Sequence, residues 1–149
     1  MSVTIAVESP LQDDVRSLID GLDAHLTSLD DEGYHMTVDE LARPSVSVFV
    51  ARDQGQAIAC GALCRHEGGI GELKRMFTVP GYQGKGIGGA ILAEIIAQAR
   101  HEGLRRVVLE TGTRQHAAWH LYEKSGFTRC GPVLDYPDVS WSVFYEKDI

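Results

Sequence analysis

A turn that holds four glycines within six residues is the segment whose composition points most directly to chemistry. It lies in Tyr82–Gly89, which reads Tyr-Gln-Gly-Lys-Gly-Ile-Gly-Gly, between a strand-like and a helix-like segment. Glycine adopts positive φ readily and lets a backbone pass close to a ligand. The amides of such a turn and the N-terminus of the next helix form a donor set for phosphate or pyrophosphate. Tight packing alone is the less favoured interpretation, because glycines lower helix propensity.

Two kinds of phosphate ligand fit this turn. Gly84-x-Gly86-x-x-Gly89 matches the fingerprint of NAD-type dinucleotide-binding enzymes, and Glu110 lies 21 residues further on, near the place of a ribose-binding acid. Three features oppose that alternative: the preceding strands read as antiparallel, one strand alone follows before the next helix, and residues 80–82 lengthen the connection. The Walker pattern G-x-x-x-x-G-K-[ST] is absent from the sequence.

Apolar periodicity predicts a mixed α/β layer fold with antiparallel strands first and a β-α-β arrangement later. Strands are expected over residues 3–7, 46–50, 57–65, 70–78, 106–110, 127–130 and 140–146. Helices are expected over residues 10–26, 37–41, 87–101 and 115–124. Ser9 is the expected N-cap of the first helix and Pro10 opens its first turn.

Two motifs within these elements resemble the GNAT N-acetyltransferase superfamily. Gln83-x-x-Gly86-x-Gly88 matches the family's Q/R-x-x-G-x-G/A motif, and residues 76–80 resemble the strand that leads into it. About 35 residues later comes a segment similar to the family's N-x-x-A-x-x-L-Y-x-x-x-G-F pattern, carried by Gln115, Ala118, Leu121, Tyr122, Gly126 and Phe127. Residues 72–77 and 109–112 resemble a bacterial subgroup of small GNATs.

The resemblance covers nearly the whole chain and implies one N-acetyltransferase domain over residues 1–149. It implies a mixed, mostly antiparallel sheet flanked by helices, in which the acetyl-CoA strand splays from its neighbour at a β-bulge. Acetyl-CoA is then the co-substrate and no metal is expected. The residues that the resemblance assigns to acetyl-CoA are Met76, Phe77, Thr78, Gln83, Gly84, Lys85, Gly86, Ile87, Gly88, Gly89 and Gln115.

The sequence departs from the family pattern at two of these positions. Gln83 stands where the family often has Arg, which keeps a hydrogen-bond donor but lowers the local positive charge, and Lys85 could compensate. Gln115 stands in place of the family's Asn, one methylene longer.

Three residues are candidates for catalysis by transfer of acetyl to a primary amine. Tyr122 matches the family's tyrosine, whose hydroxyl can protonate the leaving CoA thiolate; the alternative is a buried structural aromatic. An alkylamine is mostly ammonium at pH 7, so a base or water chain must take a proton. Glu72 and Glu110 lie near the family's base positions; each could instead be a structural partner of nearby basic residues. A non-catalytic acyl-CoA-binding module is the alternative function.

The net charge and the distribution of acidic residues predict the class of partner and acceptor. The net charge of −7 disfavours a nucleic-acid partner. From Glu8 to Glu40 there are ten acids and one base, and in GNATs the first helices flank the acceptor cleft. A small-molecule or peptide amine that is cationic, such as a polyamine, an aminoglycoside-like amine or a basic peptide, is therefore expected. The alternative is a solvated acidic face. Tyr34 and His35 could line the acceptor pocket or lie in a solvated loop.

The remaining features concern cellular location, metal binding and oligomeric state. No apolar run reaches about 18 residues and the first residues carry no secretory pattern, so neither a membrane nor export is expected. Three cysteines are expected to be reduced thiols in the cytoplasm. His116 and His120 have helical i, i+4 spacing but no third ligand in register, so a metal site is not expected. A homodimer is expected only because GNAT relatives often dimerise.

Overall fold

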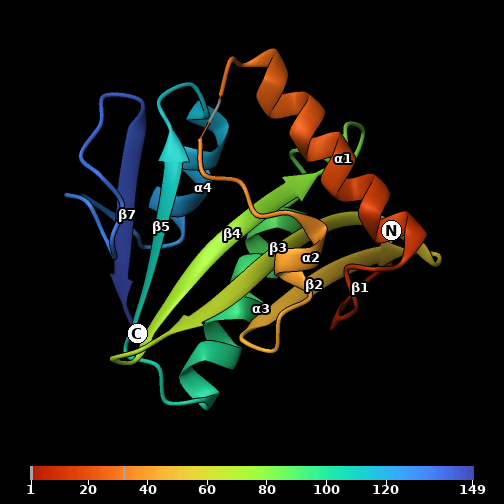
Figure 1. Cartoon of the computed structure of the whole chain (residues 1–149). Coiled ribbons are helices and arrows are strands. Elements are labelled where there is room, and N and C mark those ends of the chain that lie inside the picture. Colours follow the sequence, from red (N-terminus) through yellow and green to blue (C-terminus); the bar gives the residue numbers. More distant parts are fainter. Residues whose placement is uncertain (1, 32) are drawn as a thin grey trace.

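Seven strands form one mixed sheet in the computed structural model, which describes residues 2–31 and 33–149 (Figure 1). Their spatial order is β1-β2-β3-β4-β5-β7-β6, and every neighbouring pair is antiparallel except β4 with β5. The predicted mixed, mostly antiparallel fold is confirmed. The strands are β1 Val3–Val7, β2 Val46–Asp53, β3 Gln56–His66, β4 Ile70–Thr78, β5 Arg106–Gly112, β6 Thr128–Cys130 and β7 Ser142–Asp148.

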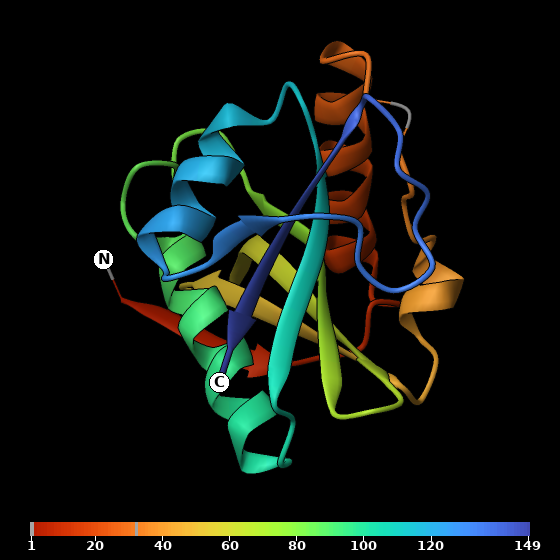
Figure 2. The ribbon, with the colours of Figure 1, turned by 90° about the vertical axis from the view of Figure 1, so that its left-hand side faces the viewer.

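Helices cover both faces of this sheet. They are α1 Asp13–Ser28, α2 Val38–Leu41, α3 Ile87–His101 and α4 His116–Lys124. Figure 2 shows α1 and α2 on one side of the sheet and α3 and α4 on the other. Within the described residues, no helix combines the length and the apolar character that a membrane crossing requires.

Two buried clusters hold the layers together. On one face, α1 residues Val15, Leu18 and Ile19 pack with Val48 and Val50 of β2. On the other face, apolar residues of α3 pack with sheet residues; this cluster includes Ile91, Leu92, Ile95, Leu63, Leu73 and Leu109. Burying an aliphatic side chain of this size contributes about 1.5–3 kcal/mol, so the apolar stripes fix which face each helix covers.

The start of α1 differs from the prediction. The helix begins at Asp13, with Gln12 rather than Ser9 in the N-cap position. The Ser9 hydroxyl accepts the Leu11 amide at 3.1 Å, and the Gln12 side chain donates to the Ser9 carbonyl at 3.0 Å. These local hydrogen bonds hold residues 9–12 in a turn. The turn competes with the helical conformation, so the helix starts later than predicted.

The strands β4 and β5 pair over only three positions. Ile70, Gly71 and Glu72 lie opposite Arg106–Val108, and no pairing follows among the described residues. The register of β4 against β3 shifts a few residues further on, between Lys74 and Phe77, where Arg75 has φ +58°. A bulge strengthens the local twist and redirects a strand. The predicted splay at a bulge is therefore present, and it opens the sheet between the C-terminal halves of β4 and β5 (Figure 1).

The C-terminus of α3 is tied to the sheet by a bidentate ion pair. Arg65 of β3 donates to both oxygens of Glu102, at 2.5 Å and 2.7 Å. Hydrogen bonding to Arg65, with a smaller contribution from Gln98, lowers the Glu102 pKa to about 2. Because this pKa is below its ordinary value of 4.5, the pair stabilises the fold fully above pH 4.5 and loses that contribution as pH falls toward 2.

We predict that Glu102→Gln lowers the free energy of unfolding by about 1 kcal/mol at pH 7, the upper range for a partly exposed pair. The melting temperature should fall by about 2–4 °C. The difference from the wild type should shrink between pH 4.5 and pH 2. Asp148→Asn is the control, because Asp148 pairs with Arg106 while its side chain is 83% exposed. Equal melting temperatures for Glu102→Gln and wild type at pH 7 would contradict this role.

Candidate active site

The glycine-rich turn forms an open cradle at the N-terminus of α3. Gly84 has φ +75° and Gly86, the N-cap, has φ +80°, conformations that side chains rarely adopt. A Cβ at either position would meet no atom within 4 Å, so the space above the turn is free. The first amides of a helix have no intrahelical partner and carry the positive end of the helix dipole. This geometry suits an anion.

A cavity of about 540 Å³ runs from this cradle along the C-terminal end of β4 to α4. Ten of the eleven residues assigned to acetyl-CoA line it: Met76, Phe77, Thr78, Gln83, Gly84, Gly86, Ile87, Gly88, Gly89 and Gln115. Gln83 also donates to the Thr78 carbonyl at 2.9 Å, which ties the turn to the end of β4. Lys85 is not among the lining residues, and its Nζ lies 5.6 Å from the centre of the Tyr82 ring.

The large cavity has further lining residues that the sequence did not assign to it. His25 and Leu29 come from the C-terminal part of α1 and its cap, and Arg114, His116 and Leu121 come from the region of α4. Leu121 belongs to the recognised helix motif, whereas the α1 residues reach the cavity only through tertiary packing. A helix spaced for core packing thus also supplies one wall of the cavity.

A second, smaller cavity of about 50 Å³ adjoins the first on the side of α1. Tyr122 and Gln115 line both cavities. The smaller cavity also contacts Glu110 of β5 and both Tyr34 and His35 of the loop after α1. Tyr34 and His35 therefore line a pocket, and that this pocket takes the acceptor stays a prediction.

Tyr122 is a buried phenol at the junction of the two cavities. Its ring packs near Phe127 and Tyr145, at centroid distances of 6.1 Å and 5.9 Å. Burial, with the nearby charge of Glu110 as the smaller cause, raises its pKa above the ordinary value of 10. The hydroxyl therefore stays protonated near neutral pH and can donate a proton or a hydrogen bond.

Glu110 is the carboxyl group that faces the smaller cavity. Ser142 donates a hydrogen bond of 2.7 Å to its Oε2, which leaves Oε1 without a protein donor among the described residues. Burial raises the pKa of Glu110, and the Ser142 hydrogen bond partly opposes this. A raised carboxyl pKa makes the carboxylate a stronger base, which suits proton abstraction.

Glu72 lies in a different environment. Its side chain is buried and does not line the smaller cavity. Oε1 lies 2.9 Å from His66 Nε2, and Oε2 accepts from the Tyr136 hydroxyl and lies 3.7 Å from Lys74 Nζ. Both carboxylate oxygens are thus engaged by structural partners. The structure brings Glu110 to Tyr122 and separates Glu72 from the cavity.

The loop after α1 contacts the end of β5. Asp31 accepts a hydrogen bond of 2.5 Å from the Gln115 side chain, and its carboxylate packs against Gly112, where a Cβ would overlap it. Asp31 also lies 3.6 Å from His35 Nε2. The Gln115 amide that the sequence assigned to the cofactor is therefore already oriented by an acid from α1's loop.

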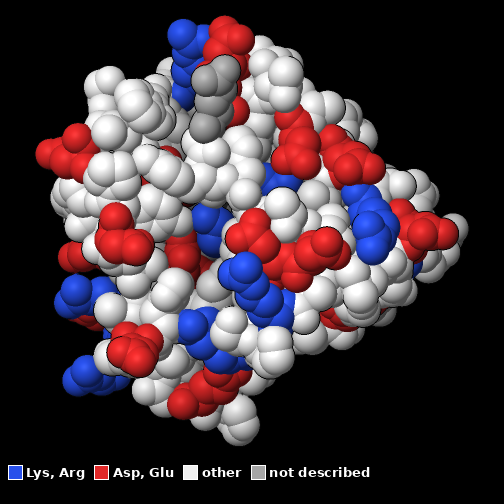
Figure 3. Space-filling model, in the orientation of Figure 1, with Lys and Arg blue, Asp and Glu red and all other residues white. Residues whose placement is uncertain are grey.

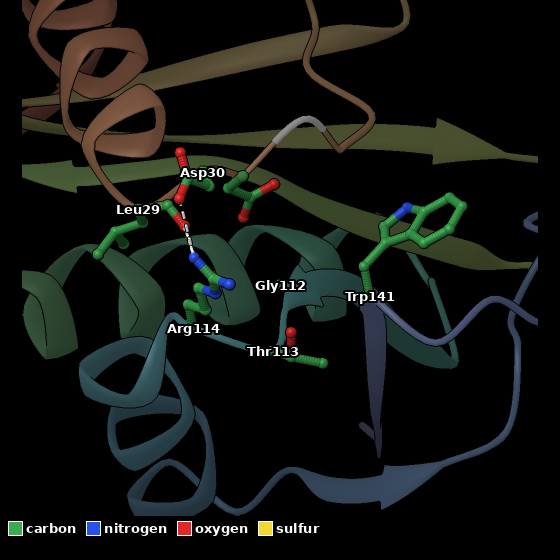
Figure 4. A pocket seen from close by; sticks show the side chains of 7 residues that line it. Leu29, Asp30, Gly112, Thr113, Arg114 and Trp141 are labelled. Carbon is green, nitrogen blue, oxygen red and sulfur yellow. Dashed lines mark hydrogen bonds and ion pairs between the residues drawn. The ribbon is translucent and has the colours of Figure 1, made fainter.

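A third cavity of about 340 Å³ lies beside the contact between Asp31 and Gly112 (Figure 4). Arg114 reaches Asp30 at 3.0 Å on one side of it, and the exposed Trp141 stands on the other. This cavity shares Leu29 and Arg114 with the large cavity.

The acidic segment does not form a continuous negative surface. Glu8 and Asp14 both pair with Arg52, at 2.8 Å and 2.7 Å, and Asp23 pairs with Arg75. Figure 3 shows acidic and basic side chains interspersed on the face that carries α1. The expected excess of acid is present in the sequence, but much of it is neutralised locally.

The remaining chemistry-bearing residues have structural environments. Burial raises the pKa values of Cys60 and Cys64 to about 12, so neither is a ready thiolate nucleophile. The His116 ring lies 3.0 Å from the Thr113 carbonyl. No cluster of three or more metal-ligating side chains occurs within residues 2–31 and 33–149.

Comparison with known proteins identifies a family and structures that this chain resembles. The model of the acetyltransferase (GNAT) family matches residues 16–127. The IAA acetyltransferase of Azospirillum brasilense is 42% identical over 99% of each chain. A structure from Klebsiella pneumoniae, described as an acyl-CoA N-acyltransferase, has a TM-score of 0.85, with 33% identity over 98% of this chain and 97% of its own. The Thermoplasma acidophilum PaiA N-acetyltransferase in complex with coenzyme A shares the fold, with a TM-score of 0.77 and 17% identity over the full length of both chains.

We predict that Gly86→Asp abolishes binding of acetyl-CoA, because the carboxylate would occupy the anion cradle. Acetyl-CoA at about 100 times its dissociation constant should stabilise the wild type by about 2.7 kcal/mol, visible as a thermal shift. NAD should give no shift. Gly103→Asp is the matched control: Gly103 has φ +82° and open space like Gly86, but lies beyond the other end of α3. A shift with NAD alone, or an unchanged acetyl-CoA shift in Gly86→Asp, would contradict the assignment.

Proposed function

The chain belongs to the GNAT acetyltransferase family, and from this premise we propose that it moves the acetyl group of acetyl-CoA directly to a primary amine within a ternary complex. The observation that carries the proposal is the position of Tyr122, which lines the large cavity and the smaller cavity together. Acetyl-CoA occupies the large cavity and the amine enters the smaller one, so the two reactants meet beside this phenol.

The chain's own groups hold the cofactor at two places. The amides of Gly84–Gly89 and the α3 N-terminus bind the pyrophosphate, and Gln83 replaces the arginine of other family members. The edge of β4 that faces β5 is unpaired beyond Glu72, so Met76–Thr78 can bind the pantetheine arm through the backbone. Backbone donors at this edge polarise the thioester carbonyl and stabilise the tetrahedral oxyanion.

Glu110 takes the proton from the attacking amine in this mechanism. It is the carboxylate in the smaller cavity, and its raised pKa matches a general base better than that of an exposed carboxyl group. Tyr122 then gives its proton to CoA as the carbon–sulfur bond breaks, and a neutral phenol is what burial maintains there. Glu72 supports the fold through Tyr136 and His66 rather than taking part in the chemistry.

Family membership favours an enzyme over the non-catalytic acyl-CoA-binding module. It also contradicts the NAD-type alternative, as does the antiparallel pairing of β3 with β4 ahead of the glycine turn. The single domain, the cytoplasmic location and the homodimer stay predictions. The cationic acceptor stays a prediction as well: its support is the acidic segment and Glu110, the acid that lines the smaller cavity.

We predict that Tyr122→Phe lowers kcat by about 10²–10⁴-fold, the usual contribution of general-acid catalysis, with little change in acetyl-CoA affinity. The melting temperature should be nearly unchanged, because the ring and its packing remain. The measurement is CoA release under saturating acetyl-CoA.

Tyr145→Phe provides the matched control for this substitution. Tyr145 is also buried, but its hydroxyl donates to Glu123 at 2.5 Å, away from both cavities. This variant should lose about 1 kcal/mol of stability and keep its kcat. A near-normal kcat in Tyr122→Phe would remove the phenol as the acid.

We predict that Glu110→Gln lowers kcat/KM by about 10²–10⁴-fold. In the wild type, kcat/KM should fall as pH drops through the raised pKa of Glu110, because the protonated carboxyl group cannot accept the amine's proton. The variant should lack this acidic limb.

Glu72→Gln distinguishes the two carboxylates. It should lose stability, since it removes the charge that faces Lys74, while retaining kcat/KM within a few-fold. The opposite pattern, with activity lost in Glu72→Gln and kept in Glu110→Gln, would reverse the assignment.

A further inference from the structure

Arg75 is a buried cation with unused hydrogen-bonding capacity. Its side chain is 3% exposed, and Nη2 donates to Asp23 of α1. Nε and Nη1 are buried and have no partner among the described residues. Buried donors are almost always paired, because leaving them unpaired is costly, so two open donors on one charged group require an explanation.

The bulge in β4 determines where this side chain lies. Leu73 and Met76 pack into the cluster on the α3 face. Between them, Lys74 reaches the Tyr34 carbonyl at 2.8 Å, and Arg75 reaches Asp23, so both lie on the α1 face. Consecutive strand residues normally alternate between faces, and the bulge suspends that alternation. The smaller cavity is on this same face.

Basic residues and the two residues proposed for catalysis therefore line the same smaller cavity. Arg75, Lys74 and His35 line it together with Glu110 and Tyr122. Lys74 already has three partners, namely the Tyr34 carbonyl, the Tyr136 hydroxyl and Glu72. Of Lys74 and Arg75, Arg75 is the one whose side chain keeps donors without a partner among the described residues.

A second unpaired group lies at the same cavity. The hydroxyl of Thr111 is buried and has no hydrogen-bond partner among the described residues, and Thr111 lines the cavity from β5. Burial, and next the positive charge of Arg75, lowers the pKa of His35, so its imidazole is neutral at pH 7. Two residues that line this cavity, Arg75 and Thr111, thus carry buried polar atoms without a partner among the described residues.

We propose that the acceptor is an amine that also carries a carboxylate, as in an amino acid, and that Arg75 binds this carboxylate while the amine faces Glu110 and Tyr122. The inference rests on the proposed function. A volume of about 50 Å³ has room for a group of carboxylate size. A guanidinium donates charge-assisted hydrogen bonds to a carboxylate, and Nε and Nη1 of Arg75 are the nitrogens without a partner among the described residues.

This substrate class departs from the cationic acceptor that the acidic segment predicts, because a zwitterion carries no net charge. A second ammonium, as in a polyamine, would meet the buried Arg75 guanidinium, and like charges at close range oppose binding. A zwitterion places its ammonium toward Glu110 and its carboxylate toward Arg75.

The first experiment compares matched acceptors with the wild-type enzyme. CoA release is measured with amino acids, with their carboxamides and with putrescine. The proposal predicts that kcat/KM for an acid exceeds that for its amide by about 10–100-fold, typical for loss of a charge-assisted hydrogen bond. Amides or putrescine used as well as the acids would overturn this inference and leave the proposed function standing. CoA release with none of these acceptors would count against both.

The second experiment tests Arg75 itself. Arg75→Gln should lower kcat/KM for the acid by about 10–100-fold, change that for the amide little, and bring their ratio near one. Asp23→Asn is the control, because it removes the ion pair from the side of α1 and leaves the Arg75 charge in place; the acid preference should remain. Equal loss for acid and amide in Arg75→Gln would make Arg75 purely structural.

If Arg75→Gln does not fold, inhibition of the wild type decides. Simple carboxylates without an amine, such as propionate, should compete with the acceptor, and propionamide should not. Equal inhibition by the two, or none by propionate up to concentrations far above the acceptor KM, would overturn the inference.

Discussion

The unpairing of β4 from β5 is the constraint on which the rest of this molecule depends. The two strands share hydrogen bonds only from Ile70 to Glu72, and beyond that point the sheet divides. Exposed strand edges are normally covered or paired, since unpaired amides and carbonyls are costly when buried. Here the open edge borders a cavity of about 540 Å³ instead. A backbone that the sheet leaves unsatisfied is thus available to a ligand.

The same bulge that turns β4 away also sets the charge distribution. It places Lys74 and Arg75 on one face, where an alternating strand would place one. Glu72 neutralises Lys74 within a buried group that includes Tyr136, and Asp23 partly compensates Arg75. Backbone geometry and electrostatics are therefore coupled, because one irregularity lies where β4 leaves β5 and also places two cations on the α1 face.

The sequence predicted the elements well because their signals are local. Apolar periodicity located the strands and α3, and the glycines of the turn need positive φ at Gly84 and Gly86. The start of α1 was predicted wrongly, since hydrogen bonds that the side chains of residues 8–12 make to one another and to the backbone compete with the helix there. The splay and bulge came from the family resemblance rather than from any residue pattern.

What the sequence could not provide were contacts between distant segments. The hydrogen bond from Gln115 to Asp31, the His25 and Leu29 wall of the large cavity, and the position of Arg75 under α1 all depend on how α1 crosses the sheet. The sequence could not rank Glu72 against Glu110 either. Glu72 is buried among hydrogen-bonding partners, whereas Glu110 faces a cavity, and this difference appears only in the three-dimensional structure.

A crystal structure of the protein with acetyl-CoA tests the central claim most directly. The account predicts the pyrophosphate against the amides of Gly84–Gly89, the pantetheine arm along the free edge at Met76–Thr78, and the thioester beside Tyr122. Acetyl-CoA bound away from the opening between β4 and β5, or with its pyrophosphate away from the glycine turn, would contradict it.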